Sequence, residues 1–186
     1  MSNTEKNIKI NEYKKYIADH INNVVWAYHK HFEPLKDYEN LNSVYFTSHD
    51  LSIAFINLDK TIEDHDKSKY SLEEFEPYRK HFYPTEDEKS EAGYANKDRI
   101  EFEKAWTHHY KSNPHHPQYW QVNGINHNMP LNYIIEMLCD WIAMGNYFNT
   151  STKDWYENKA EKEKSFMTEN TKKVVEELLY DILDID

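Results

Sequence analysis

Histidine and aspartate side chains with the chemistry of metal ligands are spread over about two-thirds of this 186-residue chain. Imidazole nitrogens and carboxylate oxygens together form a mixed ligand shell that suits Mn, Fe, Co, Ni or Zn. The groups that a folded chain could bring together are His20, His65, Asp66, His109, His115, His116 and Asp140. Such a set is large enough for two ions that share a bridging carboxylate. We therefore predict a metal site with one or two divalent transition-metal ions.

Helices are the elements that must position these residues. The chain has only three glycines and six prolines, and its apolar residues recur mostly at a spacing of about 3.6 residues instead of alternating. A chain of 186 residues is most simply one domain. The sequence therefore predicts an all-α protein of about six to seven helices, in a single compact domain over residues 1–186 with its core over about residues 10–183.

Two of the expected helices carry ligands in the first part of the chain. A helix over residues 10–31 would place His20 on its apolar face. Ser48 can cap a second helix, whose apolar stripe ends on the pair His65-Asp66. Both helices would therefore direct ligands toward the core.

Two later helices carry further ligands. A helix over about residues 98–111 has His109 on its apolar face, and His108 is the alternative. A strongly apolar helix over about residues 130–145 carries Asp140 on the face that we expect to be buried. A carboxylate in such surroundings needs a positive partner, which a metal ion can supply.

The segments between these helices have signals of their own. Ser71 and Glu74 have the spacing of a capping box, which predicts a helix over about residues 72–82. The polar and charged segment 84–97 predicts a surface loop.

Two pairs of candidate ligands lie outside the apolar stripes. The pair His115-His116 follows a proline on an extended corner, where two side chains can face different directions. A second His-Asp pair, His49-Asp50, comes just after the expected helix cap, and an aspartate has an ordinary role in the first turn of a helix. We therefore assign His115 and His116 to the metal site and leave His49-Asp50 out of it.

Charge and cysteine content exclude several classes of protein. The formal net charge is −11, with 33 acidic and 22 basic residues, so duplex nucleic acid would meet a repulsive field. A single cysteine rules out an intrachain disulfide, and the N-terminal residues lack the apolar segment of a signal peptide. No stretch approaches the roughly 20 apolar residues that cross a bilayer. We expect a soluble, cytoplasmic protein without a membrane or duplex nucleic-acid partner.

The order of the candidate ligands resembles that of the HD superfamily of metal-dependent phosphohydrolases, which is named for an adjacent His-Asp pair on a helical core. In two-metal members the ligands run His, His-Asp, His, His or His-His, then Asp, and this chain presents its candidates in the same order. Residues 65–69 are similar to the family's His-Asp-x-Gly-Lys, with serine in place of glycine. The resemblance implies an HD-like helical fold and places Lys69 at the family's phosphate-facing lysine.

The chain looks more closely similar to an uncharacterised group of small bacterial and phage proteins on the same plan. The resemblance covers most of residues 15–180. The matching segments are residues 65–69, 73–75, 105–109, 113–120 and 136–141.

The resemblance implies a phosphomonoesterase or phosphodiesterase that acts on a nucleotide or another small phosphate ester. Asp66 would bridge two ions, and hydroxide formed from metal-bound water would be the nucleophile. Lys69 would stabilise the negative charge that develops on the phosphate. The implied ligands of one ion are His20, His65, Asp66 and Asp140, and those of the other are Asp66, His109 and one or both of His115 and His116.

Simpler interpretations of single residues stay open at this point. His20 could be a hydrogen-bonded core histidine, and Asp140 could pair with Arg79, Arg99 or a lysine. Lys69 could be a solvated turn residue, and Glu136 could lie behind the ligands or on the surface. Two other functions also stay open: an HD-type di-iron oxygenase, and a non-enzymatic protein in which metal stabilises the bundle or a nucleotide-binding pocket.

Overall fold

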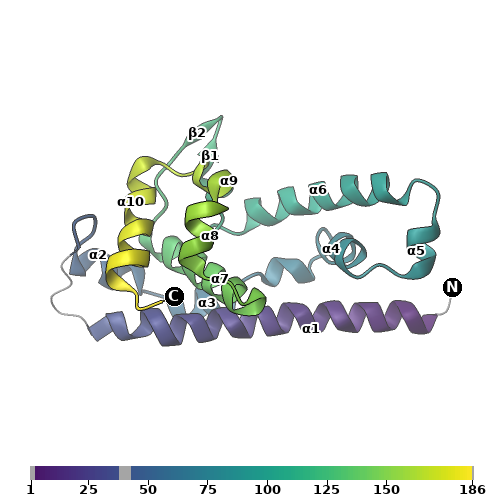
Figure 1. The fold of residues 1–186 in the computed structure, drawn as a ribbon, viewed down its shortest axis with the longest axis horizontal. Coiled ribbons are helices and arrows are strands. Elements are labelled where there is room, and N and C mark those ends of the chain that lie inside the picture. The colour runs from purple at the N-terminus through teal and green to yellow at the C-terminus, as the bar shows by residue number, and fades with distance from the viewer. Residues whose placement is uncertain (1–2, 38–42, 186) are drawn as a thin grey trace. The chain divides into compact units, whose positions relative to one another are not determined.

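Helices form nearly all of the regular structure of the chain (Figure 1). This computed structural model describes residues 3–37 and 43–185. The α-helices are α1 (Asn3–Ala27), α2 (Ser48–Ala54), α3 (Leu58–Glu63), α4 (Phe75–Phe82), α5 (Glu86–Ser90), α6 (Tyr94–Ser112), α7 (Leu131–Phe148), α8 (Thr152–Asn158), α9 (Glu161–Lys164) and α10 (Glu169–Glu177). The prediction of an all-α fold is confirmed.

Short helical turns and one hairpin complete the described structure. The turns are η1 (Tyr28–Phe32), η2 (Glu33–Asp37), η3 (Lys67–Tyr70), η4 (Pro117–Trp120) and η5 (Leu178–Ile182). Strands β1 (Gln121–Val122) and β2 (Ile125–Asn126) pair antiparallel. Asn123 and Gly124 join them with φ values of 52° and 78°, the left-handed conformation that a two-residue hairpin turn needs.

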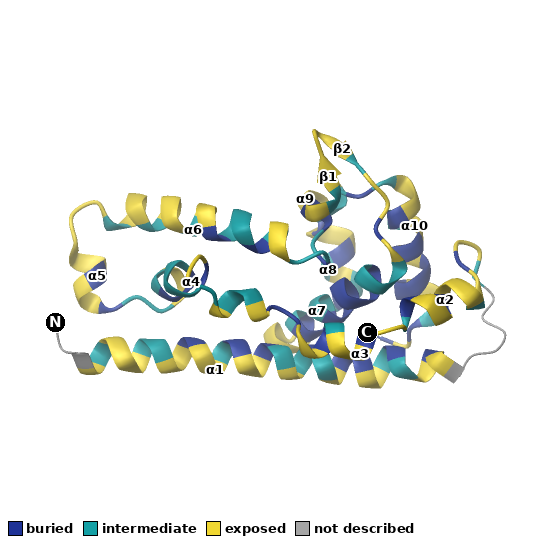
Figure 2. Ribbon diagram, turned by 180° about the vertical axis from the view of Figure 1, so that it is seen from behind, coloured by how far each residue is buried: buried dark blue, intermediate teal, exposed yellow. Residues whose placement is uncertain are grey.

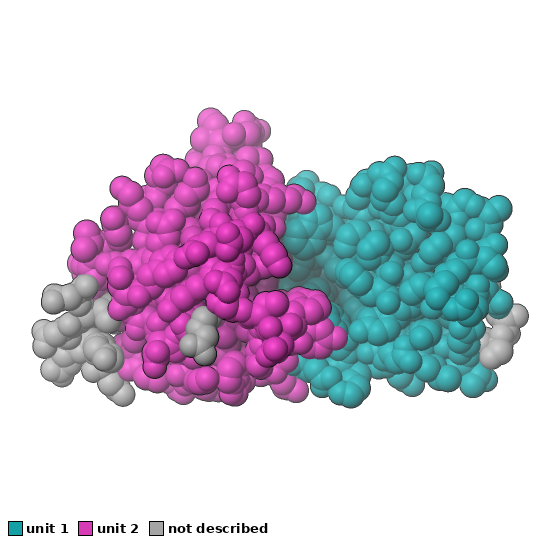
Figure 3. All heavy atoms as spheres, in the orientation of Figure 1, with its two compact units in different colours: residues 1–19, 66–113 teal, residues 20–65, 114–186 magenta. Residues whose placement is uncertain are grey.

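The chain folds into two compact units (Figure 3). Unit 1 comprises Met1–Asp19 and Asp66–Asn113, and unit 2 comprises His20–His65 and Pro114–Asp186. The chain changes unit before His20, between His65 and Asp66, and before Pro114. Each change falls at or directly beside a predicted ligand. A single domain over the whole chain stays a prediction.

Helix α7 forms the centre of unit 2 (Figure 2). It contacts α2, α3, η1, α8 and α10, and it buries Glu136 together with most of its apolar residues between Ile134 and Gly145. A side chain at Gly145 would lie 2.8 Å from the Thr150 carbonyl oxygen and 2.9 Å from Thr152 Oγ1. Glycine therefore allows the chain to turn closely back toward α8. The apolar surroundings fix the helix that carries Asp140.

Unit 1 has a more polar interior. Helix α4 packs on α6, and the ring of Tyr13, from the part of α1 in this unit, lies 5.2 Å from the ring of Phe75 at the start of α4. Arg79 is fully buried and donates hydrogen bonds of 2.7 and 2.5 Å to the two carboxylate oxygens of Glu88. A guanidinium is always charged, and its burial is costly without such a partner, so this ion pair is part of the core.

The predicted helix before the His-Asp pair is in fact two helices. Asn57 adopts a left-handed conformation with φ 63° and separates α2 from α3. Thr47 is the cap of α2, not Ser48, and it forms a capping box with Asp50. The expected role of Asp50 in the first helical turn is confirmed.

Two further expectations about local structure were wrong. Helix α4 begins at Phe75 and not near residue 72, and the Glu74 side chain has other partners, described below. The segment 84–97 contains α5 and the first turn of α6, because Thr85 and Glu88 form a capping box there. Among the described residues, no helix has both the length and the apolar composition needed to cross a membrane.

Candidate metal centre

Three predicted ligands come together in unit 2. His20 lies on α1, His65 on the turn after α3, and Asp140 on α7. Asp140 Oδ1 lies 3.2 Å from His20 Nε2 and 3.9 Å from His65 Nε2. Metal–ligand bonds of about 2.0–2.2 Å place ligand atoms around one ion roughly 3–4 Å apart. The donor set and its spacing therefore fit a divalent ion.

Asp140 is ionised in this setting. Burial by itself would raise the pKa of Asp140, but the hydrogen bond and charge of His20, followed by the charges of His65 and His115, lower the pKa below its usual range. Among the described residues, its ion-pair partners are His20 and His65. The arginines that it could have paired with are engaged elsewhere: Arg79 with Glu88 and Glu76, and Arg99 with Glu103.

Glu136 is a buried carboxylate that holds two of the histidines in unit 2. Its Oε1 lies 3.0 Å from His65 Nδ1 and 3.1 Å from His115 Nδ1. Burial opposes ionisation, yet hydrogen bonds from His115 and His65 lower the pKa of Glu136. Because a carboxylate accepts hydrogen bonds, a metal-bound His65 would carry its hydrogen on Nδ1, facing Glu136, and would present Nε2 to the metal. Glu136 therefore belongs to the site and not to the surface.

The same residues also offer a second grouping. One oxygen of Glu136 and one nitrogen each of His65 and His115 lie within 4.8 Å of one another, as do the corresponding atoms of His20, His65 and Asp140. Both groupings use His65. They are consistent with one ion on the Nε2 side of His65, supported from the Nδ1 side by Glu136.

A second cluster of predicted residues lies in unit 1. Asp66 Oδ1 is 3.2 Å from His109 Nε2, and Asp66 Oδ2 is 2.5 Å from Lys69 Nζ. Asp66 has φ 55°, a left-handed conformation that aspartate tolerates better than most residues. Lys69 is therefore an ion-pair partner with a mostly buried side chain, 12% exposed, and not a solvated turn residue.

Glu74 pairs with two histidines of unit 1, as Glu136 does with two histidines of unit 2. Its Oε2 lies 2.8 Å from His109 Nδ1, and its Oε1 lies 2.7 Å from His108 Nδ1. Ser68 also donates a hydrogen bond to Glu74. Burial opposes ionisation, but His109, His108 and Ser68 together lower the pKa of the fully buried Glu74.

The inner histidine of α6 is His109, as the helical pattern predicts. It is 1% exposed, whereas the side chain of His108 is 38% exposed. Burial would lower the pKa of His109, and the charge and hydrogen bond of Asp66 and the hydrogen bond of Glu74 raise it. His108 contacts Oε1 of Glu74, the glutamate whose Oε2 contacts His109.

His115 and His116 lie in unit 2 at the corner before η4. Their rings are 4.2 Å apart, and the ring of His115 is 4.3 Å from that of His65. His115 is buried and His116 is half-buried. His115 thus joins the histidines around Glu136, and the coordination of a metal by His116 stays a prediction.

The predicted residues therefore gather as two clusters. Unit 2 brings together His20, His65, His115 and Asp140, and unit 1 brings together Asp66, Lys69 and His109. The peptide bond between His65 and Asp66 joins the two clusters covalently. The binding of two metal ions that both clusters share stays a prediction.

Sequence reasoning missed the role of Glu74. Its position three residues after Ser71 suggested a local cap, whereas its carboxylate pairs with histidines on α6. The inward-facing His109 was the available signal, because a buried histidine on a helix needs a hydrogen-bond partner for Nδ1.

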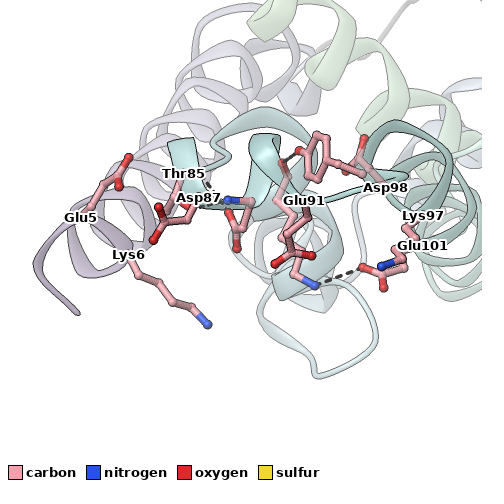
Figure 4. Close-up of a pocket in the computed structure, with 11 residues that line it drawn as sticks. Glu5, Lys6, Thr85, Asp87, Glu91, Lys97, Asp98 and Glu101 are labelled. Carbon is pink, nitrogen blue, oxygen red and sulfur yellow. Dashed lines mark hydrogen bonds and ion pairs between the residues drawn. The ribbon is translucent and has the colours of Figure 1, made fainter. Parts of the chain in front are cut away.

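A pocket of about 360 Å³ also lies in unit 1, away from these residues (Figure 4). Its lining comes from α1, α4, α5 and α6 and is mostly charged, with Glu5, Asp87, Glu91, Asp98 and Glu101 among the acidic side chains. None of the predicted ligands lines it. Three of its acidic side chains have basic partners: Glu101 pairs with Lys80, Asp98 with His81 and Glu88 with Arg79. We assign this pocket no role in the site.

Comparison with known proteins gives a family but no activity. Neither the curated proteins nor the solved structures contain a match to this chain. A family model described as a family of unknown function, DUF5662, matches residues 9–181. Because this match covers nearly the whole chain, including every residue of both clusters, the protein belongs to the DUF5662 family.

Proposed function

We propose that this protein is a metal-dependent phosphohydrolase that acts on a nucleotide or another small phosphate ester. The observation that carries the proposal is the buried group of His20, His65 and Asp140, whose ligand atoms converge at distances that suit one divalent ion. The resemblance of the ligand order to HD phosphohydrolases supports the same function. Mn, Fe, Co, Ni and Zn all accept such a ligand set.

The residues of each cluster have distinct parts in this proposal. His20, His65 and Asp140 would hold one ion, and Asp66 and His109 would hold the other, with His115 and His116 as further ligands. When bound, divalent ions lower the pKa of a coordinated water and draw charge from phosphate oxygens. Asp66 would supply the bridging carboxylate.

Three side chains near the ligands support the same chemistry. Glu74 and Glu136 hold imidazole Nδ1 atoms, which keeps the opposite ring nitrogens directed at a metal. Lys69 supplies a positive charge beside Asp66, where it would stabilise the charge that develops on the phosphoryl oxygens. In this proposal no protein side chain acts as nucleophile.

The test combines elemental analysis with an activity screen. Protein purified without chelator should contain Mn, Fe, Co, Ni or Zn, and it should release phosphate from a nucleotide or small ester when supplied with Mn, Co or Ni. His65→Ala should lose one of the two ions and abolish phosphate release. The matched control is His49→Ala, because His49 belongs to the other His-Asp pair and lies on the exposed start of α2.

Two results would overturn the hydrolase proposal in different ways. Iron-dependent oxygen consumption without phosphate release would indicate a di-iron oxygenase. Bound metal with no turnover of any phosphate ester, and with loss of folding on metal removal, would indicate a non-enzymatic protein that metal stabilises.

A further inference from the structure

Two buried tyrosine hydroxyls in unit 1 have no hydrogen-bond partner among the described residues. They belong to Tyr13 on α1, which is 0% exposed, and to Tyr78 on α4, which is 5% exposed. A phenol that is buried without an acceptor destabilises the fold, and buried tyrosine hydroxyls usually have a partner. The two hydroxyls therefore call for an explanation.

Other tyrosines of the chain follow the usual rule. Tyr28 donates to Asp59 at 2.6 Å, Tyr94 donates to the Lys80 carbonyl oxygen at 2.8 Å, and Tyr180 donates to a glutamate at 3.0 Å. Tyr28 is only 1% exposed, as deeply buried as Tyr13 and Tyr78, and its hydroxyl still has an acceptor. The missing acceptors are thus a local property of the region around α4.

This region is the one that contains the Asp66 cluster. The ring of Tyr78 lies 5.8 Å from the ring of His109, and Lys69 Nζ lies 5.9 Å from the centre of the Tyr78 ring. Lys69 in turn pairs with Asp66. Tyr78 therefore lines the cluster directly.

Tyr13 lies beside the same charges. After burial, the carboxylate of Asp66 and then that of Glu74 contribute most to raising the pKa of both Tyr13 and Tyr78. A tyrosine hydroxyl carries a hydrogen that it can donate, and neither of these two has an acceptor among the described residues. Two donors and the Lys69 ammonium then lie near one carboxylate that we assign to metal.

We propose that Tyr13 and Tyr78 are substrate-binding residues whose hydroxyls donate hydrogen bonds to the non-bridging oxygens of a phosphoryl group, next to Lys69. This inference rests on the proposed phosphohydrolase function. A phosphoryl group is an acceptor with several oxygens, so it can satisfy both hydroxyls and the ammonium at once. The tyrosines would add specificity for phosphate that the metal ligands alone do not provide.

The experiment measures binding of inorganic phosphate to the full chain loaded with Mn²⁺, by isothermal titration calorimetry. Tyr13→Phe and Tyr78→Phe keep the ring and remove only the hydroxyl. Each variant should bind phosphate about ten-fold to a hundred-fold more weakly, the range expected for one hydrogen bond to a charged group. Tyr94→Phe is the matched control in unit 1, because its hydroxyl already has an acceptor, and its phosphate affinity should not change.

Thermal unfolding of the same variants without phosphate gives a second readout. Loss of a hydroxyl that has no acceptor should leave the Tm unchanged or raise it, whereas Tyr94→Phe should lower it. A lower Tm for Tyr13→Phe and Tyr78→Phe would mean that their hydroxyls have acceptors within the fold, which contradicts the inference.

Unchanged phosphate affinity in both tyrosine variants, or no phosphate binding by the wild type, would overturn the inference. Failure of the tyrosine inference can be distinguished from failure of the proposed hydrolase function. Phosphate release that persists with unaltered KM in both variants would reject the tyrosine role alone. The converse result is also possible: both variants bind phosphate more weakly, but the wild type hydrolyses no ester. That result would support the tyrosine role and reject the hydrolase function.

Discussion

The interior of unit 2 is mainly apolar, whereas the interior of unit 1 is more polar. The main hydrophobic cluster of buried residues lies entirely in unit 2, around α7. Unit 1 instead buries Tyr13, Tyr78, Glu74 and the Arg79 guanidinium. Unit 2 therefore derives its stability from apolar burial, at about 1.5–3 kcal/mol for each fully buried large side chain, whereas unit 1 depends more on hydrogen bonds and ion pairs. Such polar interiors are specific but sensitive to the loss of one partner.

The two candidate ligand clusters share one feature and differ in another. In each, one buried glutamate holds two imidazole rings: Glu74 in unit 1 and Glu136 in unit 2. Only the cluster of unit 1 includes a lysine among its described ion pairs, Lys69 with Asp66. In the cluster of unit 2, the described ion pairs of Asp140 and Glu136 are with histidines alone, so a metal ion would stabilise that cluster most. The cluster of unit 1 is better suited to a substrate anion.

The largest expected effect is that of Asp66→Ala. If Asp66 bridges two ions, its loss should remove bound metal and reduce activity by more than about 100-fold, beyond the 10–100-fold loss typical of residues behind the ligands. Elemental analysis and phosphate release measure these effects, and circular dichroism should show unchanged helical content. Full metal content in this variant would contradict the assignment of Asp66.

Glu88→Gln should test the polar interior of unit 1. Arg79 would lose its bidentate partner and keep only Glu76, so the free energy of unfolding should fall by about 3 kcal/mol. Chemical denaturation measures this change. An effect below about 1 kcal/mol would show that the buried pair contributes little and would weaken the contrast between the units.

The same pair should make stability depend on pH. Hydrogen bonds from Arg79 lower the pKa of Glu88 from 4.5 to about 2. Because the pKa is lower in the folded state, this contribution is complete above about pH 4.5 and is lost as the pH falls toward 2. Glu88→Gln should therefore lose less stability than the wild type over this range. Parallel pH profiles for the two proteins would refute this origin of the acid sensitivity.

Glu136→Gln and Glu74→Gln compare the supporting carboxylates of the two clusters. An amide can still accept a hydrogen bond, but it does not carry the charge that raises the basicity of the imidazoles, so metal affinity should fall by about 10–100-fold. The loss should be greater for Glu136→Gln, since the described ion pairs of the unit 2 cluster include no lysine, whereas those of the unit 1 cluster include Lys69. Competition with a fluorescent chelator measures the affinities. Equal losses would show that the lysine makes no difference.

Asp50→Ala should have the smallest effect. It removes one half of the capping box of α2, but Thr47 still caps the helix, so the free energy of unfolding should fall less than in any variant above. Metal content should be unchanged. A loss of metal from this variant would mean that the His49-Asp50 pair, and not His65-Asp66, supplies the ligands.

Helical periodicity was sufficient to predict the all-α fold and the inward position of His109. It also placed His20 and Asp140 on buried faces, because apolar neighbours at helical spacing identify the core side of each helix. These properties depend on residues that are near one another in the sequence.

Features that depend on tertiary contacts could not be predicted in this way. The break at Asn57 results from a left-handed backbone that the local pattern did not require. Glu74 is 34 residues from His108, and Glu136 is 71 residues from His65, so no local rule connects them. The buried Arg79–Glu88 pair likewise forms only when α4 and α5 pack.

Metal stoichiometry tests the central claim most directly. Protein dialysed against excess Mn²⁺ and then freed of unbound ion should contain two equivalents per chain, with one lost in His20→Ala and one lost in His109→Ala. His29→Ala, at an exposed histidine outside both clusters, should retain both. Wild-type protein with no more than trace metal, or full retention in His20→Ala and His109→Ala alike, would contradict the account.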